Sequence, residues 1–587
     1  MEKKTHLLGK DLSLEETIEK ATSLLKDMDL NIEAVSWLNP TPNCWSVHIQ
    51  CRACHQLYTN GKGISRLASL ASGLGEFFER LSTNLFFADY FLGDDKDERP
   101  FHFYPNEQWF PPVHGNVIPT HNEHGIEMLN ESLRAFYNPD GELKFTHLCD
   151  NNTHSKNQRI SALPFRSLTN DQTLYFPVSL LNNLYVSNGM AAGNSPAECR
   201  SQALSEIIER YVKNIIIAEG ICLPDVPSVY LRKYPKLCAI LDTLAGQQLN
   251  VRVKDASLGG KYPVICVLVA DPDSGGVFAS FGANCRFETA IERTLTELLQ
   301  GRDLDQFKEF QPPCHDINQV ADPFNLESHF VNSDGLLSWN MFKNKTDFEF
   351  SPWDFEGSTN QEFAQLQQII SDNGFHIYCA EYLQCGMYSC RLLVPGMSEI
   401  YPIDDLVWNN KGTGAQLRPY LLRLPDMTKE ELGELFELIE TLGLNEQQLV
   451  SQIIGVLFDD HSNWAALSIG ELKALILLAL NRRDEAAMWC SWCLDYGILP
   501  QNRKRLYRLL QSLLSFQIAG DDTNDFLGGL SLFYQAEELH EAESILNGTL
   551  TFPGLNFSNS WIEISSQHKN LLEIYEQVNR RKAVSTP

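Results

Sequence analysis

Polar and apolar side chains alternate with a helical period in residues 187–213, SNGMAAGNSPAECRSQALSEIIERYVK. Asn194 or Ser195 can cap the start of this helix, and Pro196 suits the first turn, where its missing N–H would have no partner. At about 100° per residue, the apolar side chains gather between about 220° and 320° from Glu198. The opposite face carries Glu198, Gln202, Glu206, Glu209 and Arg210.

Taken alone, this polar face has an ordinary explanation as a solvated surface. Glu206 precedes Arg210 by four residues, and Glu209 precedes Lys213 by four. Pairs in this order stabilise an exposed helix by about 0.3 kcal/mol each. Charged runs on helices are most often solvated. The segment by itself therefore leaves open whether its polar face is a surface or a site.

Repetition elsewhere in the chain favours a site. The pattern L-x-E-φ-φ-E-R, in which φ is apolar, occurs at 74–80 and again at 204–210, and a weaker copy lies at 295–300, shortly after Arg293. Each copy follows a strand-like run and a glycine-containing turn, at Asn60-Gly61, Asn188-Gly189 and Phe281-Gly282. Internal repeats indicate repeated structural units. We therefore expect three strand–turn–helix units whose acidic helices meet in one site.

The first 425 residues mix predicted helices and strands. Ser13 and Glu16 form a capping box at the start of an N-terminal helix. Residues 44–59 predict a strand, followed by a TNGKG turn at 59–63 and a helix to about residue 86. Further β-rich runs lie at 177–187, 263–270, 277–281, 375–383 and 389–395. Strands interleaved with helices predict an α+β fold with an α/β-type core of strand–turn–helix units.

After Pro425 the pattern becomes helical throughout. Helices are predicted at 428–455, 468–480, 484–496, 502–518, 525–536 and 538–547. Paired short helices resemble tetratricopeptide hairpins, for which we expect a docking or homodimer-forming role. A plain helical bundle without a partner is the alternative. The predicted division is an N-terminal helix and lead-in strand at 1–58, a main domain at 59–425, and an all-α tetratricopeptide-like domain at 426–587.

Composition narrows the classes of function. The formal net charge of −28 over 587 residues argues against a nucleic-acid backbone as direct partner. The start of the chain lacks the apolar core of a signal peptide, and the longest apolar run is too short to span a bilayer. Fifteen cysteines without a disulfide-like framework fit reduced thiols. We expect a cytoplasmic protein that does not enter membranes.

Clustered carboxylates need a cation between them, because buried like charges repel one another. Magnesium fits, since it prefers oxygen ligands and shares them with substrate phosphates. Arg210 and Arg293 could then hold phosphate oxygens, and Asn194 and Gln202 could bond a nucleotide. The chain has no G-x-x-x-x-G-K-[ST] sequence. A di-metal hydrolase is the competing interpretation, although the three acidic helices contain no histidine ligand.

Several segments together resemble the YcaO family: NGKG…GLGEFFERLSTNLFFADY, LYVSNGMAAGN…ECRSQALSEIIERYVKN, YPVICV…FASFGA…ERTLTELLQGR and VPGMSEIYP. The resemblance runs nearly end to end. It implies a domain that binds ATP through two Mg²⁺ ions held by glutamates. Better-understood members phosphorylate a peptide amide oxygen, so that a nucleophile attacks the activated carbon. The stand-alone bacterial member is linked to RimO-dependent β-methylthiolation of an aspartate in a small-subunit ribosomal protein.

The resemblance also implies roles for residues that match its motifs. It places the magnesium ligands among Glu76, Glu79, Glu198, Glu206, Glu209 and Glu297. It places ATP contacts at Lys10, Thr17, Asn194, Gln202, Arg210 and Arg293. From the residues alone, Lys10 and Thr17 are surface positions. The chain departs from the family pattern at Ala191, where a hydroxyl residue is expected, and at Thr17, which replaces serine.

Three functions follow as hypotheses. The first is an ATP-hydrolysing accessory factor in RimO-linked methylthiolation, with ATP and Mg²⁺ as cofactors and a ribosomal protein and a RimO-type enzyme as partners. The second is direct activation of a backbone amide in an unidentified peptide. The chain ends AVSTP, without the proline-rich run of the family's cyclodehydratases, which disfavours cyclodehydration. The third is a nucleotide-binding scaffold that acts through its helical tail.

Overall fold

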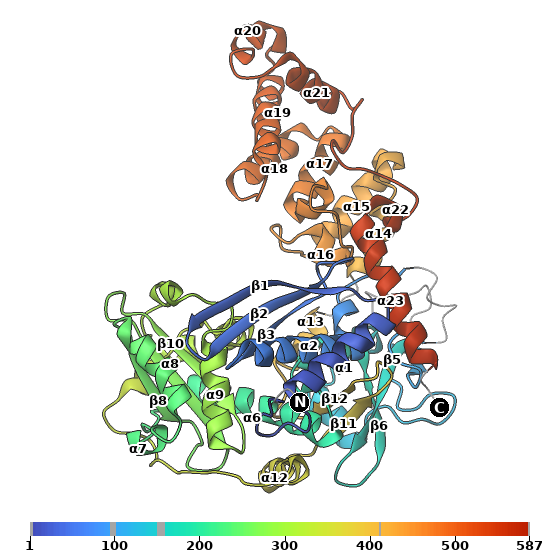
Figure 1. The fold of residues 1–587 in the computed structure, drawn as a ribbon. Helices are drawn as coiled ribbons and strands as arrows, with labels where there is room; N and C mark the ends of the chain where they lie inside the picture. The colour runs from blue at the N-terminus through green and yellow to red at the C-terminus, as the bar shows by residue number, and fades with distance from the viewer. Residues whose placement is uncertain (1–3, 94–100, 150–158, 410–412, 585–587) are drawn as a thin grey trace.

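The computed structural model describes residues 4–93, 101–149, 159–409 and 413–584. Its strands form three sheets (Figure 1). The first contains β1 (Ile32–Thr41), β2 (Cys44–Cys51) and β3 (Tyr58–Gly63), and the second contains β8 (Asn250–Asp255), β9 (Val264–Ala270) and β10 (Val277–Ala283). The third has the order β4-β5-β11-β12-β7, with β6 beside β5; its strands are β4 (Gln108–Phe110), β5 (Ile160–Ser167), β6 (Thr173–Pro177), β7 (Met190–Gly193), β11 (Tyr378–Tyr382) and β12 (Tyr388–Leu393).

The prediction of a mixed fold of helices and strands is confirmed. Every pairing between these named strands is antiparallel. Helices pack against the sheets: α1 (Leu14–Asp27), α2 (Arg66–Ser82), α6 (Pro196–Glu219), α8 (Pro235–Gly246), α9 (Phe287–Leu298) and α12 (Thr359–Asp372). Antiparallel sheets combined with packed helices are the α+β arrangement.

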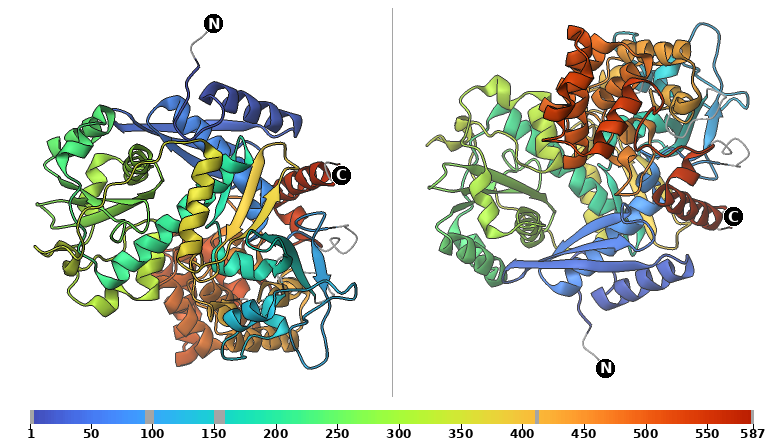
Figure 2. Two further views of the ribbon diagram at one scale, coloured as in Figure 1. Left: turned by 90° about the horizontal axis from the view of Figure 1, so that it is seen from below. Right: turned by 90° about the horizontal axis from the view of Figure 1, so that it is seen from above.

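Helix α6 lies at the centre of the sheet-containing part, between the β8–β10 sheet and the sheet that holds β11 and β12 (Figure 2). In strand β9, Cys266 and Leu268 belong to the core beneath α6. Their neighbours Val267 and Val269 belong to the core beneath α8 and α9. Because alternate side chains point to opposite faces, one strand serves both cores. The continuous apolar run at 263–270 reflects burial on both sides.

The predicted TNGKG turn is wrong, because these residues form most of strand β3. Gly61 pairs with Val47 of β2. A side chain at Gly61 would collide with the backbone of Ser69 and Gly73 in α2. The glycine is therefore needed for close strand–helix packing rather than for a turn. Strand β1 lies outside every predicted element.

The predicted β-rich run at 177–187 is also wrong. It forms the short helix α5 (Val178–Leu180) and a π-helical turn at Leu181–Tyr185. Most of its apolar side chains are buried. A short apolar run buried on several sides shows no period that separates strand from helix.

The region after Pro425 is helical, as predicted, and stands apart from the sheets in Figure 1. Its helices include α15 (Lys429–Leu442), α16 (Val450–Ile454), α17 (Ile469–Leu480), α18 (Arg483–Asp495), α19 (Gln501–Ala519) and α21 (Ala536–Leu546). The helix predicted at 428–455 is interrupted at Gly443, whose φ of 60° ends α15. The segment 525–536 contains only the short α20 (Leu527–Leu530) and a 3₁₀ turn. The likeness to tetratricopeptide hairpins remains a prediction.

The last helix, α23 (Ser566–Val584), was not predicted and returns to the sheet-containing part (Figure 1). Leu571, Ile574 and Tyr575 are buried in the same core as α1 and α2. The Tyr575 hydroxyl donates a hydrogen bond to the carbonyl of His102 at 2.7 Å. The two ends of the chain therefore share one core, and the division at residue 425 remains a prediction.

The structure can be compared with two features of the composition, the cysteines and the length of the apolar runs. All fifteen cysteines are free thiols. The pair Cys51 and Cys54 lies in the core with α2, whereas Cys490 and Cys493 lie in the core of the helical region. Within the described ranges, the helices are all too short or too polar to cross a bilayer.

The substitution Leu571→Ala tests whether α23 stabilises the N-terminal core. Leu571 is fully buried, so its truncation should lower the free energy of unfolding by about 2–5 kcal/mol. Denaturant titration monitored by circular dichroism would measure the change. Lys569→Ala on the exposed face of α23 is the control and should change stability by less than about 0.5 kcal/mol. Equal stability of the two variants would contradict the docking of α23.

Candidate active site

The three repeated helices α2, α6 and α9 meet around one cavity of about 550 Å³, which the N-terminal segment and the start of α1 also line. The structure brings every candidate residue from the sequence to this cavity. Helix α2 contributes two of them, α6 contributes five and α9 contributes two, and the others come from the N-terminal region and the turn before α6. They are Lys10, Thr17, Glu76, Glu79, Asn194, Glu198, Gln202, Glu206, Glu209, Arg210, Arg293 and Glu297. Their roles as ligands remain predictions.

Close packing of β10 on α9 sets the position of α9, which forms one wall of the cavity. A side chain at Gly282 would lie 2.7 Å from the backbone nitrogen of Thr294 and 2.8 Å from the carbonyl oxygen of Ala290. Like Gly61 on α2, Gly282 lets a strand lie directly on the helix that follows it. The glycines predicted to form turns in the first and third units thus serve strand–helix contact.

The last residue of edge strand β10 is held from both sides by cavity residues. The backbone N–H of Ala283 donates to Glu209 of α6 at 3.2 Å. The Arg293 guanidinium of α9 donates to the Ala283 carbonyl at 3.1 Å and also to the side chain of Gln202. Edge strands leave backbone groups unpaired, and here site residues satisfy them.

Glu198 anchors the N-terminal segment over the cavity. It is 4% exposed and accepts hydrogen bonds from Lys10 Nζ at 3.2 Å and from the backbone N–H of Asp11 at 3.1 Å. Asn194 Nδ2 donates to Thr17 Oγ1 at 3.0 Å. The surface placement of Lys10 and Thr17 from the residues alone is wrong, because Thr17 is buried and both side chains line the cavity.

Of the two ion pairs expected along α6, the structure contains one. Arg210 contacts Glu206 at 2.9 Å, inside the cavity rather than on an open surface. Lys213 is instead buried and donates to the His329 carbonyl at 2.6 Å and to Ser333 at 3.0 Å. Glu209 is thereby free to contact Ala283. The solvated-surface interpretation of this helix face is wrong.

Negative charge dominates the cavity. Among the described residues, nine glutamates but only five lysine and arginine side chains line it. Burial raises the pKa of Glu79 to about 8, against the opposing effect of Arg80, and Glu206 adds to the increase. Burial also raises the pKa of Glu209. These carboxylates therefore lack full compensation by the protein's own cations.

The chemistry of this cavity fits magnesium and a nucleotide. Within the described ranges, no three carboxylate, histidine or cysteine side chains converge into a preformed metal cage. The glutamates nevertheless supply the oxygen ligands that Mg²⁺ prefers, and the incompletely compensated carboxylates favour an added cation. The buried Oδ1 of Asn194 has no hydrogen-bond partner in the described structure, so it is available to a ligand.

Sequence reasoning missed several cavity residues. Glu288 and Glu292 share the inner face of α9 with Arg293, so the helical period could have found them. Arg80 belongs to the first repeat and contacts Glu76 at 3.1 Å. Asn284 and Glu362 come from other elements and gave no local signal, whereas Lys62 lies in the NGKG segment that was predicted to be a turn.

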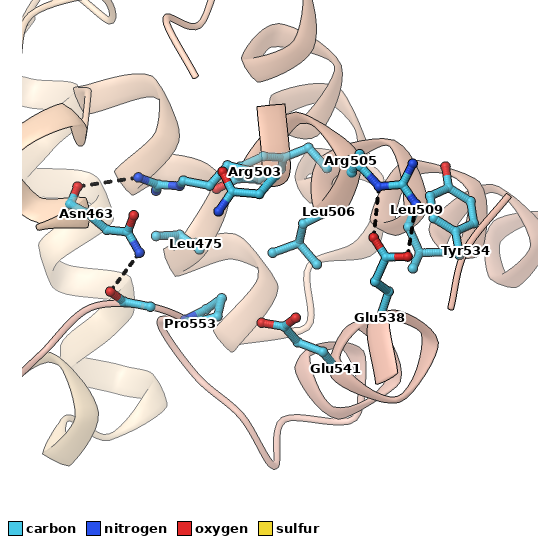
Figure 3. Close-up of a pocket in the computed structure, with 13 residues that line it drawn as sticks. Asn463, Leu475, Arg503, Arg505, Leu506, Leu509, Tyr534, Glu538, Glu541 and Pro553 are labelled. Carbon is cyan, nitrogen blue, oxygen red and sulfur yellow. Dashed lines mark hydrogen bonds and ion pairs between the residues drawn. The ribbon is translucent and has the colours of Figure 1, made fainter. Parts of the chain in front are cut away.

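A second cavity, of about 220 Å³, lies in the helical region beside α19 (Figure 3). Leu475, Leu506 and Leu509 contribute apolar surface to it. At its rim Arg505 contacts Glu538 at 2.9 and 3.0 Å. It contains none of the candidate residues, so the acidic cavity is the candidate active site.

Comparison with known proteins shows the family of this chain and leaves the roles of the individual site residues as predictions. Residues 60–398 match the sequence model of the YcaO cyclodehydratase, described as ATP- and Mg²⁺-binding, and residues 414–584 match that of the YcaO cyclodehydratase C-terminal domain. The chain belongs to the YcaO family. Its cofactors are accordingly ATP and Mg²⁺, and YcaO cyclodehydratases form an enzyme class that activates amides with ATP.

Two curated relatives align with 99% of this YcaO chain, and the alignments include 99% of each relative's own length. One, from Escherichia coli K12, is 42% identical and is named ribosomal protein S12 methylthiotransferase accessory factor YcaO. The other, from Haemophilus influenzae, is 40% identical and is an uncharacterized protein.

The solved structures similar to this chain are more distant in sequence. A heterocyclase in complex with substrate and cofactor is 17% identical, with a TM-score of 0.45 over 68% of this chain and 54% of that one. YcaO from Methanopyrus kandleri, bound with AMPPCP and Mg²⁺, is 16% identical, with a TM-score of 0.40 over 66% and 92% of the respective chains.

Ala191, where the family resemblance predicts a hydroxyl residue, is not among the residues that line the cavity. Ala191, in β7, is fully buried in the core next to α6, and the cavity lining begins one residue later at Ala192. The departure at Ala191 therefore leaves the cavity lining unchanged. Thr17, the other departure, keeps its hydroxyl in contact with Asn194.

The substitution Glu79→Gln should stabilise the protein when Mg²⁺ and nucleotide are absent. The pKa of Glu79 is raised to about 8 in the folded state, above its value of about 4.5 in the unfolded chain. The stability that the Glu79 carboxyl contributes is therefore fully present below pH 4.5 and is lost as the pH rises towards 8. Glutamine removes this loss, which should raise the free energy of unfolding at pH 8 by at least about 1 kcal/mol. Denaturant titrations at pH 5.5 and pH 8 measure it.

The exposed Glu19 of α1 provides the control for this comparison, because Glu19→Gln should leave the difference between the two pH values unchanged. If Glu79→Gln shows the same pH dependence as the unsubstituted protein, burial of the Glu79 carboxylate does not cost stability.

Proposed function

We propose that this chain is an ATP-hydrolysing accessory factor in β-methylthiolation of an aspartate in ribosomal protein S12, acting with a RimO-type methylthiotransferase. The observation that carries the proposal is the meeting of all the family-matched residues at one acidic cavity. The identity of 42% over 99% of a relative named as the S12 methylthiotransferase accessory factor supports the biological role.

The proposal assigns roles to residues by their position in the cavity. Glutamates of α2, α6 and α9 hold Mg²⁺, which neutralises phosphate charge and orients the nucleotide. Arg210 and Arg293 come from facing helices and bind phosphate oxygens. Asn194, with its unpaired Oδ1, bonds the nucleotide, and Lys10 and Thr17 close over it from the N-terminal segment. None of these assignments requires a phosphate-binding glycine loop.

ATP cleavage in this proposal activates an amide oxygen, in line with the cyclodehydratase description of the family model. The alternative within the same chemistry is activation of a backbone amide in a peptide other than S12. ATP turnover that rises with such a peptide, while S12 modification does not depend on the chain, would favour that alternative.

A scaffold role for the helical tail is the remaining candidate. Exposed apolar side chains such as Ile498, Leu532 and Phe533 lie in this region and suit docking or a homodimer contact. Deletion of everything after residue 425 is a poor test, because it removes α23 from the N-terminal core. Point substitutions on the tail surface are the appropriate probes.

The substitution Glu206→Gln tests the nucleotide site. Glu206 lies in the cavity on α6 and belongs to the proposed magnesium ligands. The variant should fold normally and lose at least about a hundredfold in ATP hydrolysis, because an amide cannot replace a negatively charged ligand. Phosphate release and circular dichroism measure the two properties.

Glu219→Gln is a matched control, because Glu219 lies exposed at the end of the same helix, outside the cavity. It should retain full hydrolysis. Unchanged hydrolysis in Glu206→Gln would contradict the site assignment.

The biological role is tested by mass spectrometry of ribosomal proteins from cells that lack this chain. We expect the methylthio-aspartate of S12 to fall strongly and to recover with the unsubstituted gene but not with Glu206→Gln. A methylthio-aspartate level that does not change would refute the role as accessory factor, whatever the ATPase result.

A further inference from the structure

Lys62 is a cavity residue whose position follows from its neighbours in β3. Gly61 and Gly63 face α2, where a side chain at Gly63 would approach the Cβ of Ala68 to 2.7 Å. Alternate residues of a strand point to opposite faces. Lys62 therefore points away from the packed face of β3 and reaches the cavity.

On that side Lys62 forms an ion pair with Glu297 of α9. The neighbouring carbonyl of Asn60 accepts a hydrogen bond from Gln300 Nε2 at 2.5 Å. These two contacts join β3, the strand that precedes α2, to the C-terminal end of α9. They connect units of the cavity that lie more than two hundred residues apart in the chain.

Like the pair of Lys10 with Glu198, this pair joins two separate elements, and in this it differs from the arginine pairs within α2 and α6. Glu76 and Glu206 each contact an arginine one turn further along the same helix, Arg80 and Arg210. Such i,i+4 partners stay close whatever the rest of the fold does. The partner of Glu297 instead comes from a separate element on a long flexible side chain, so it can leave without disturbing α9.

We propose that Lys62 is a positioning residue that holds Glu297 while the site contains no metal ion, and that it moves to nucleotide phosphate oxygens when Mg²⁺ and ATP bind. The inference rests on the proposed function. A divalent ion competes with the single charge of an ammonium group for Glu297, and the phosphates offer the displaced ammonium group a new anionic partner. Its side chain is 31% exposed, which leaves room for this movement.

Such an exchange makes metal binding depend on the nucleotide. Free Mg²⁺ must displace Lys62 without offering it another partner, so its affinity is reduced. Mg²⁺ that arrives with ATP brings phosphates for Lys62, so its affinity is increased. Lys62 would therefore weaken the binding of Mg²⁺ to the acidic cavity when no nucleotide is present.

Isothermal titration calorimetry of the full chain with MgCl₂ and no nucleotide tests this inference. Lys62→Gln should bind Mg²⁺ about threefold to tenfold more tightly than the unsubstituted protein, because Glu297 loses its competing cation. The same variant should bind ATP with Mg²⁺ more weakly. Lys569→Gln, on the exposed surface of α23, should match the unsubstituted protein in both titrations.

Lys62→Arg serves as a second variant, also where Lys62→Gln does not fold. A guanidinium can hold a carboxylate through two hydrogen bonds, so this variant should bind free Mg²⁺ more weakly than the unsubstituted protein. Free Mg²⁺ affinity that stays equal or falls in a folded Lys62→Gln, or that stays equal or rises in Lys62→Arg, overturns the inference. If the proposed function itself is wrong, the result is different: the unsubstituted protein does not bind ATP with Mg²⁺.

Discussion

Repulsion between glutamates on α2, α6 and α9 is the constraint on which the candidate site depends. Three helices can bring carboxylates into one cavity only if cations lie between them. Arg80 and Arg210 supply two such charges from the acidic helices themselves, and Lys10 and Lys62 supply two more from other elements. Burial raises the pKa of Glu79 to about 8 despite the opposing charge of Arg80, so this compensation is incomplete. The remaining negative charge is what suits the cavity to a divalent ion.

The ends of the chain support the same region from two sides. Near the N-terminus, Lys10 and Asp11 bind Glu198, and Lys10 lines the cavity. Near the C-terminus, α23 packs with α1 and α2 and stabilises the core behind Glu76 and Glu79. The helical region between Pro425 and α23 is therefore attached to the site-bearing part at both of its ends. In the described part of the chain, none of the helices of that region lines the cavity.

The acidic helices were predictable because their period is local. The wheel of α6 separates the buried Leu204 and Ile208 from the cavity residues Glu206 and Glu209. The errors occurred where local pattern and tertiary contact disagree. Gly61 looked like a turn residue but permits contact with α2, and the run at 177–187 looked like a strand because it is buried on several sides. Lys213 looked like a surface partner of Glu209 but is buried against His329.

The sequence by itself determined which face of each repeated helix is acidic, that three such helices exist, and that the chain resembles the YcaO family. Only the tertiary structure decided which charges meet. Lys62 reaches Glu297, Glu198 holds Lys10, and both Glu209 and Arg293 bind Ala283. Periodicity predicts only which residues of one helix or strand share a face. These contacts instead join different elements, and their partners lie from 10 to 188 or more positions apart, as the packing of sheets and helices dictates.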